Sequence, residues 1–224
     1  MPSPLTSLDF FRDSYDTRIA QLREERAAGM KIVGTFCLYV PDEIILAAGA
    51  DRVVLCGGAA DTIPVAEQSL PRNLCPLVKS SFGAVVDACC GGNLACPHVG
   101  LVDVVVAEAT CDGKKKMYEV LSSHIPTYVL DLPQKPDSPE ALAYFGSELR
   151  RFGRFMEGLT GRTITDDALA REIRSANETR RLLHRLFGMR MADPPPIRGS
   201  EVLRVMQKQF FLSPVQFREG ITRL

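Results

Sequence analysis

The sequence lacks an excess of charge of either sign. Its 224 residues include 27 Lys and Arg and 27 Asp and Glu, so the net charge is zero. Binding nucleic acid or an anionic membrane through overall charge needs a positive excess, so the balance argues against both partners. The chain also lacks an apolar run long enough to cross a bilayer. Its first segment, MPSPLTSLDFFRDSYD, contains acids and no continuous apolar stretch, so we expect no signal peptide and a cytoplasmic protein.

Cysteine is absent from the second half of the chain. The seven cysteines all lie in the first half, at Cys37, Cys56, Cys75, Cys89, Cys90, Cys96 and Cys111. In a reducing compartment, thiols are more often ligands or free groups than disulfides. A structural zinc site prefers Cys-x2-Cys pairs, and the sequence contains none. A Cys/His nucleophile remains an alternative, because His98 and His124 lie in the same half, although their spacing does not require it.

The first 136 residues alternate between strand-like and helix-like segments. An amphipathic helix is predicted over residues 4–28, and strands over 31–36, 52–56, 101–109 and 126–133. Helices are predicted between these strands, over 41–49, 76–90 and 112–124; Pro41, Asp42 and Glu43 suit a helix start, and Gly49 suits its end. This alternation predicts an α/β fold with an open parallel sheet and helices on both of its faces.

After the segment PQKPDSP, the pattern becomes helical throughout. Two long helices are predicted, with Ser138 and Thr165 as their N-caps, and no strand is expected from Glu140 onward. The segment ADPPPIRG at 192–199 resembles a linker, and one or two further helices follow it. We therefore divide the chain into an N-terminal helix (1–29), an α/β cluster-binding domain (30–136) and a helical region (137–224).

Three cysteines occupy similar places in the predicted sheet. Cys37 follows the first strand, Cys56 ends the second, and Cys111 follows the third. Ligand sites in open parallel sheets form at the carboxyl ends of the strands. We therefore expect these thiols to converge on one edge of the sheet, although Cys56 is equally well explained as a small buried apolar residue.

The residues around the cysteines favour the binding of an anionic ligand. Cys111 directly precedes DGKKKMYE, a predicted helix start with three lysines, Lys114–Lys116, which alone would fit a solvated helix face. A helix start lowers the pKa of a thiol and offers free N–H groups. Cys75 precedes Pro76 in a similar setting, and Cys96 precedes Pro97. Thiolate-bound iron–sulfur clusters are anionic, so the pattern predicts such a cluster. Cys89 and Cys90 are adjacent, which suits chelation of one metal poorly.

Several long motifs resemble one known family. GTFCLYVPDEIILAAGADRVVLCGG, LPRNLCPLVKSSFG, TCDGKKKMYEVL, PTYVLDLPQ and DPPPIRGSEVLRVMQKQFF occur in this order. Together they resemble the 2-hydroxyacyl-CoA dehydratase D-component family, and within it most closely the double-cubane cluster proteins. The resemblance implies Rossmann-like or flavodoxin-like α/β domains with a helical insertion. It also implies a 4Fe-4S or double-cubane iron–sulfur cluster and anaerobic redox chemistry.

The resemblance also implies an electron donor and a reaction. An ATP-hydrolysing activator or reductase, itself an iron–sulfur protein, would supply electrons at low potential. In the dehydratases of this family, one electron makes a ketyl radical of the acyl-CoA and water is lost. The double-cubane proteins instead reduce small molecules. The motifs do not separate these two reactions.

The resemblance assigns ligand roles to four cysteines. Cys75 and Cys111 match the first two cluster ligands of the family, and Cys37 and Cys96 match cysteines of the double-cubane branch. Cys56 also matches that branch, and its role is left open.

Family members usually continue into a second α/β domain with further cluster cysteines, a domain that we expect this sequence to lack. We therefore expect a homodimer, or a heterodimer with a related subunit; the alternative is an apo fragment or partner subunit without a complete cluster. Two explanations are then open for three aromatic residues near the end of the sequence, Phe210, Phe211 and Phe217. They form an exposed apolar surface that a partner covers, or they pack within their own domain.

Overall fold

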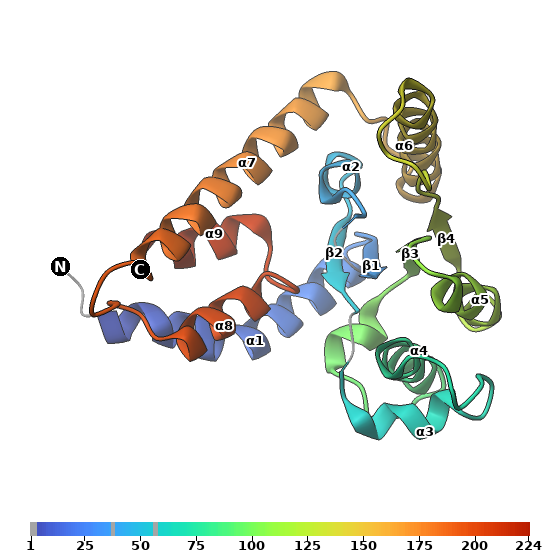
Figure 1. Ribbon diagram of the computed structural model, residues 1–224, viewed down its shortest axis with the longest axis horizontal. Helices are drawn as coiled ribbons and strands as arrows, with labels where there is room; N and C mark the ends of the chain where they lie inside the picture. The colour runs from blue at the N-terminus through green and yellow to red at the C-terminus, as the bar shows by residue number, and fades with distance from the viewer. Residues whose placement is uncertain (1–3, 37–38, 56–57) are drawn as a thin grey trace.

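A four-stranded parallel sheet lies at the centre of the α/β part of the molecule (Figure 1). The computed structural model describes residues 4–36, 39–55 and 58–224. The strands are β1 (Ile32–Phe36), β2 (Asp51–Val54), β3 (Val104–Glu108) and β4 (Thr127–Leu130). Their order is β2-β1-β3-β4, and all neighbouring strands are parallel. The predicted open parallel α/β sheet is therefore confirmed.

Both faces of the sheet are covered by helices. Ile32, Phe36 and Val105 belong to one core with side chains of α1 (Pro4–Ala27), α4 (Pro76–Cys89) and α5 (Asp112–Leu121). Val33 and Val104 belong to a second core, on the other face, with α2 (Asp42–Ala47) and α6 (Pro139–Thr160). Burial on both faces explains why β3 is an uninterrupted apolar run rather than an alternating one.

The rest of the chain is helical, as predicted. After α6 come α7 (Asp166–Met189), α8 (Gly199–Lys208) and α9 (Pro214–Thr222), and no strand occurs after residue 140 in the described part of the chain. Both predicted N-caps are confirmed, because Ser138 accepts a hydrogen bond from the Ala141 N–H and Thr165 accepts one from the Ala168 N–H. Among the described residues, no helix combines the length and apolar character needed to cross a membrane.

Some local elements differ from the prediction. Strand β3 begins at Val104 rather than residue 101, because residues 97–101 form the 3-10 helix η2 (Pro97–Leu101). Asp103 then turns its carboxylate away from the strand, accepting hydrogen bonds from the Ile32 N–H (2.9 Å) and from Arg26 (3.1 Å). The short helices η1 (Ala60–Thr62) and α3 (Ile63–Ala66) were not predicted. The expected helix end at Gly49 is confirmed, with φ of +75°.

Helix α1 joins the sheet to the C-terminal helices. Figure 1 shows α1 beside α8 and α9, and these helices are in contact. Within this region the buried Arg18 side chain forms an ion pair with Asp51 of β2 and donates a hydrogen bond to the Phe211 carbonyl (3.0 Å). Phe211 and Phe217 are buried in the same core, so these two pack within their own chain, whereas Phe210 is 38% exposed.

Candidate functional site

Three helices begin directly after a cysteine. Cys75 is the N-cap of α4, Cys96 the N-cap of η2, and Cys111 the N-cap of α5. All three residues are exposed, and none of their side chains makes a capping hydrogen bond. The first N–H groups of a helix have no partner within the helix. These helix starts therefore place thiols beside first-turn N–H groups, an arrangement that favours anions.

Cys75 is the most clearly activated of these thiols. The backbone N–H groups of Val78 and Leu77 lower its pKa, and the positive charge of Lys114 lowers it further. Lys114 belongs to α5, so α5 begins close to Cys75. The packing agrees, because a Cβ placed on Gly113 would lie 3.1 Å from the Leu74 Cδ1 atom. The structure thus brings the Cys75 and Cys111 helix starts into one neighbourhood. The predicted convergence of Cys37, Cys56 and Cys111 on one edge of the sheet stays a prediction, because Cys37 and Cys56 lie outside the described residues.

A buried carboxylate organises the segment around Cys111. Glu108, fully buried at the end of β3, forms an ion pair with the Lys114 ammonium (Oε1–Nζ distance 2.6 Å) and accepts a hydrogen bond from the Thr110 hydroxyl (3.2 Å). Its second oxygen, Oε2, has no hydrogen-bond partner among the described residues. Lys116, in contrast, is exposed and pairs with Glu119. The three lysines therefore do not all point into solvent. Lys114 is directed toward Glu108 and lies close enough to Cys75 to lower the pKa of that thiol.

Cys96 lies in a different environment, beside a tyrosine that the sequence analysis missed. The hydroxyl of Tyr15, from α1, lies 3.0 Å from His98 Nδ1. Burial lowers the pKa of His98 to about 4, and burial raises the pKa of Tyr15 to about 12, with the nearby Cys96 adding to that rise. Both side chains are therefore neutral near pH 7. Tyr15 and His98 are 83 residues apart, so no local sequence pattern relates them.

The remaining cysteines divide into two groups. Cys37 and Cys56 lie outside the described residues. Cys89 and Cys90 are exposed at the end of α4, where partial loss of hydration and the neighbouring thiol raise the pKa of Cys89. Within the described ranges, no group of three or more His, Cys, Asp or Glu residues could hold a metal ion. The predicted ligand set of Cys37, Cys75, Cys96 and Cys111 therefore stays a prediction.

A cavity of about 510 Å³ lies at the carboxyl ends of β1 and β2. Thr35 and Val54 reach it from the two strands, and further lining comes from α2, α6, α7 and the segment before α9. Its position matches the place where ligands bind in open parallel sheets. Its volume is within the range of small-molecule sites.

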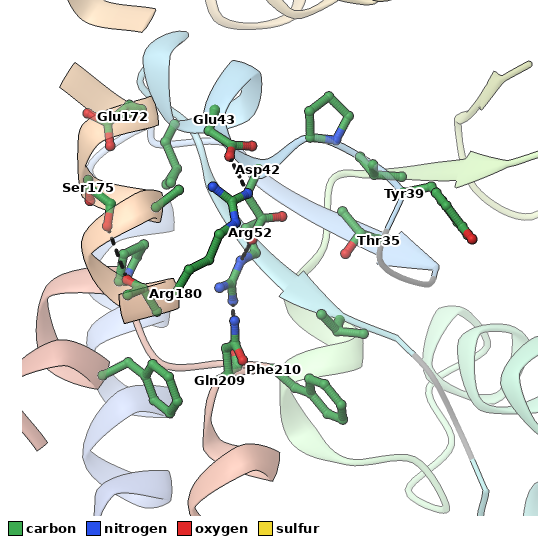
Figure 2. A pocket seen from close by; sticks show the side chains of 18 of the residues that line it. Thr35, Tyr39, Asp42, Glu43, Arg52, Glu172, Ser175, Arg180, Gln209 and Phe210 are labelled. Carbon is green, nitrogen blue, oxygen red and sulfur yellow. Dashed lines mark hydrogen bonds and ion pairs between the residues drawn. The ribbon is translucent and has the colours of Figure 1, made fainter. Parts of the chain in front are cut away.

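The charged groups of this cavity are paired with one another. Figure 2 shows the basic side chains of Arg52 and Arg180 and the acidic side chains of Asp42 and Glu43 around it. Arg52 donates to the Asp42 carboxylate (2.7 Å) and the Gln209 carbonyl (2.8 Å), and Arg180 donates to Glu43 (2.9 Å). The cavity therefore offers polar edges with little unpaired charge.

The fold and the thiols define a parallel α/β protein with a cysteine-based candidate site. Residues 37–224 match the family model described as 2-hydroxyglutaryl-CoA dehydratase, D-component. The chain belongs to this family of dehydratase and reductase subunits.

Three relatives illustrate the range of the family. The chain is 38% identical to the "Putative dehydratase subunit YjiM" of Escherichia coli, over 88% of this chain and 50% of that protein. It is 26% identical to a benzoyl-CoA reductase subunit of Thauera aromatica, over 91% of this chain and 51% of that protein. It is 20% identical to the beta subunit of (R)-2-hydroxyglutaryl-CoA dehydratase of Acidaminococcus fermentans, over 91% and 52%. The chain spans about half the length of the curated relatives it matches.

Proposed function

We propose that this chain is an iron–sulfur redox component of the dehydratase or reductase type found in its family. The observation that carries the proposal is the pair of exposed cysteines, Cys75 and Cys111, at two helix starts that pack together. Lys114 adds a positive charge next to them, held by the buried Glu108. Thiolates and helix N–H groups suit an iron–sulfur cluster, because both stabilise its negative charge or bind its iron.

In this proposal each residue has a defined role. Cys75 and Cys111 are thiolate ligands, and Cys37 and Cys96 are further ligands. When bound, a 4Fe-4S or double-cubane cluster supplies one-electron transfer at low potential. The N–H groups of Leu77 and Val78 lower the pKa of Cys75 and so favour its thiolate, which is the form that binds metal. The cavity at the ends of β1 and β2 is where a small substrate or an acyl-CoA would bind.

The proposal includes partners and a compartment. We propose that an ATP-hydrolysing activator or reductase, in the cytoplasm, supplies the electrons. Because the described residues contain no group of three metal donors, we propose that a related subunit or a second copy completes the cluster site. The names of the relatives support a partner, since each is described as a subunit of a dehydratase or a reductase.

Anaerobic reconstitution with iron and sulfide tests this function. The wild-type chain should develop the broad visible absorbance of thiolate-to-iron charge transfer, alone if a second copy completes the site, or otherwise when a related subunit is added. Cys75→Ser and Cys111→Ser should each reduce it more than about tenfold, because a hydroxyl replaces a thiolate ligand. The matched control is Cys89→Ser/Cys90→Ser, which removes two exposed thiols from the other end of α4 and should keep the absorbance. Equal loss in the control, or no absorbance in the wild type both alone and with a related subunit, would refute the assignment.

A second candidate is a non-catalytic subunit or fragment that binds no complete cluster. It is favoured by the absence of a three-donor group from the described part of the chain. The two candidates differ when a related full-length subunit is added during reconstitution. Only the redox component should then gain iron that depends on its own Cys75 and Cys111.

A further inference from the structure

A second pocket, separate from the thiols, is apolar inside and basic at its rim. It has a volume of about 550 Å³ and lies between α2, α6 and the beginning of α7. Its apolar lining comes from Ile44, Leu149, Ile164, Leu169 and Ile173. We call this pocket the α6 groove. A volume of this size is typical of sites for small organic ligands.

Two arginines dominate the rim of the α6 groove. Arg150 and Arg154 line it, and both are exposed. They are four residues apart on α6, so their side chains lie on the same face of the helix and their charges repel each other. Among the described residues, no hydrogen bond or ion pair engages either guanidinium.

The two acids of the α6 groove form no ion pair with these arginines. Glu43 is paired with Arg180 of α7 (2.9 Å). Glu157 accepts a hydrogen bond from the Ile164 N–H (2.8 Å) at the turn between α6 and α7. The carboxylates are thus engaged elsewhere, whereas both guanidinium groups are available. The groove consequently combines an apolar interior with unpaired positive charge at its rim.

We propose that the α6 groove binds an anionic amphiphile, in which an unbranched alkyl chain ends in a single carboxylate or phosphate group. The alkyl chain would pack on Ile44, Leu149 and Ile173, and the anionic head would bind Arg150 and Arg154. Burial of methylene groups supplies affinity, and the arginines fix the orientation of the ligand through charge-assisted hydrogen bonds. The lining of the α6 groove contains no cysteine, although Pro41, Glu43 and Leu149 also line the neighbouring cavity at the ends of β1 and β2.

Calorimetric titration of the iron-free chain tests the proposal. The probes are hexanoate, octanoate, decanoate and decyl phosphate, each below its micelle concentration, with 1-decanol as the neutral probe. Each added methylene that enters the groove should tighten binding about fourfold. Comparison of decanoate with decyl phosphate shows which head group the rim prefers. Affinity that ignores chain length, or equal affinity for 1-decanol, would overturn the proposal.

Charge and lining variants locate the binding. Arg150→Glu/Arg154→Glu should weaken binding of decanoate and decyl phosphate more than about tenfold, because attraction becomes repulsion. The control Arg23→Glu/Arg204→Glu makes the same change in net charge on α1 and α8, and should keep the affinity within about twofold.

Two substitutions of apolar residues by aspartate test whether the alkyl chain binds in the interior of the α6 groove. Ile173→Asp should weaken binding, whereas Leu203→Asp, at a similarly exposed site on α8, should not. Ile173 is 43% exposed, so its variant should remain folded. If no amphiphile binds but Arg150→Glu/Arg154→Glu dissociates a dimer, the groove belongs to a second copy of the chain and the proposal is wrong.

Discussion

Two helices of the α/β half and three helices of the helical half begin in different ways. In the α/β half, α4 and α5 begin after Cys75 and Cys111, and neither side chain makes a capping hydrogen bond. In the helical half, Ser138, Thr165 and Ser213 each accept a hydrogen bond from a backbone N–H of the first turn. A serine or threonine cap typically stabilises a protein by about 1 kcal/mol relative to alanine.

The comparison separates helix starts that stabilise the fold from helix starts that carry a reactive thiol. At the cysteine starts the first-turn N–H groups lie beside an exposed thiol, and at Cys75 the N–H groups of Leu77 and Val78 lower the pKa of that thiol. The serine and threonine starts satisfy one of these N–H groups with a side-chain oxygen. In our proposal α4 and α5 begin at residues that bind an anion, whereas the capping hydrogen bonds of α6, α7 and α9 stabilise the fold.

The largest effect that we predict is on the pH dependence of stability. It concerns His98 in η2, the third helix that begins after a cysteine, Cys96. The folded-state pKa of His98 is about 4, against an ordinary value of 6.5. Between these values the unfolded chain binds more protons, so acid favours unfolding. The contribution of His98 is present above pH 6.5 and is lost as pH falls toward 4, by about 3 kcal/mol. Denaturant titrations of wild type and His98→Gln should therefore give curves of stability against pH that converge toward pH 4. Parallel curves would show that His98 is not buried in its neutral form.

Removing a serine or threonine cap should lower the stability of the protein without changing how much iron it binds. Ser138→Ala and Thr165→Ala should each lower the free energy of unfolding by about 1 kcal/mol, because one first-turn N–H loses its partner. Urea titration measures this loss, and the iron content after reconstitution should not change. Ser147→Ala is the control, since this exposed residue lies inside α6 and caps nothing. A change in iron content would contradict the separation between the two kinds of helix start.

The two ends of α4 provide a smaller contrast within one helix. The pKa of Cys75 at its start is lowered by the Val78 and Leu77 N–H groups, whereas burial raises the pKa of Cys89 at its end. The thiolate is the reactive form. In the iron-free protein, iodoacetamide should therefore alkylate Cys75 severalfold faster than Cys89 at pH 7, as followed by peptide mass spectrometry. Equal rates would remove the physical basis for choosing Cys75 as a ligand.

The smallest predicted effect is a gain in stability when serine, a good N-cap residue, replaces the cysteine at the start of α5. Cys111→Ser should raise the free energy of unfolding by about 0.5 kcal/mol, because the hydroxyl accepts a hydrogen bond from the first turn of α5. Cys90→Ser, at the C-terminal end of α4, lacks such N–H groups and should have no effect in the same urea titration. A loss of stability in Cys111→Ser alone would mean that the thiol itself supports the fold.

Much of this architecture could be predicted from the sequence. Apolar runs and their flanking residues predicted the four strands and the long helices, and Ser138 and Thr165 were correctly assigned as caps. These features depend on residues close together in the chain. The short helices η1, α3 and η2 escaped prediction because three to five residues carry too little periodicity.

The candidate site could be predicted only in part. The places of Cys75 and Cys111 at helix starts followed from the neighbouring Pro76 and Asp112–Gly113. The pairing of Lys114 with a buried Glu108 and the contact of Tyr15 with His98 did not, because packing between separate elements sets both. No periodic pattern distinguished Lys114 from its two neighbours.

Iron and acid-labile sulfide per chain, measured on protein purified without oxygen, test the central claim most directly. The account predicts iron and sulfide in equal amounts, near or above the content of one 4Fe-4S cluster per completed site, and their loss in Cys75→Ser/Cys111→Ser. Protein that is folded, paired with a related subunit and still free of iron and sulfide would contradict it.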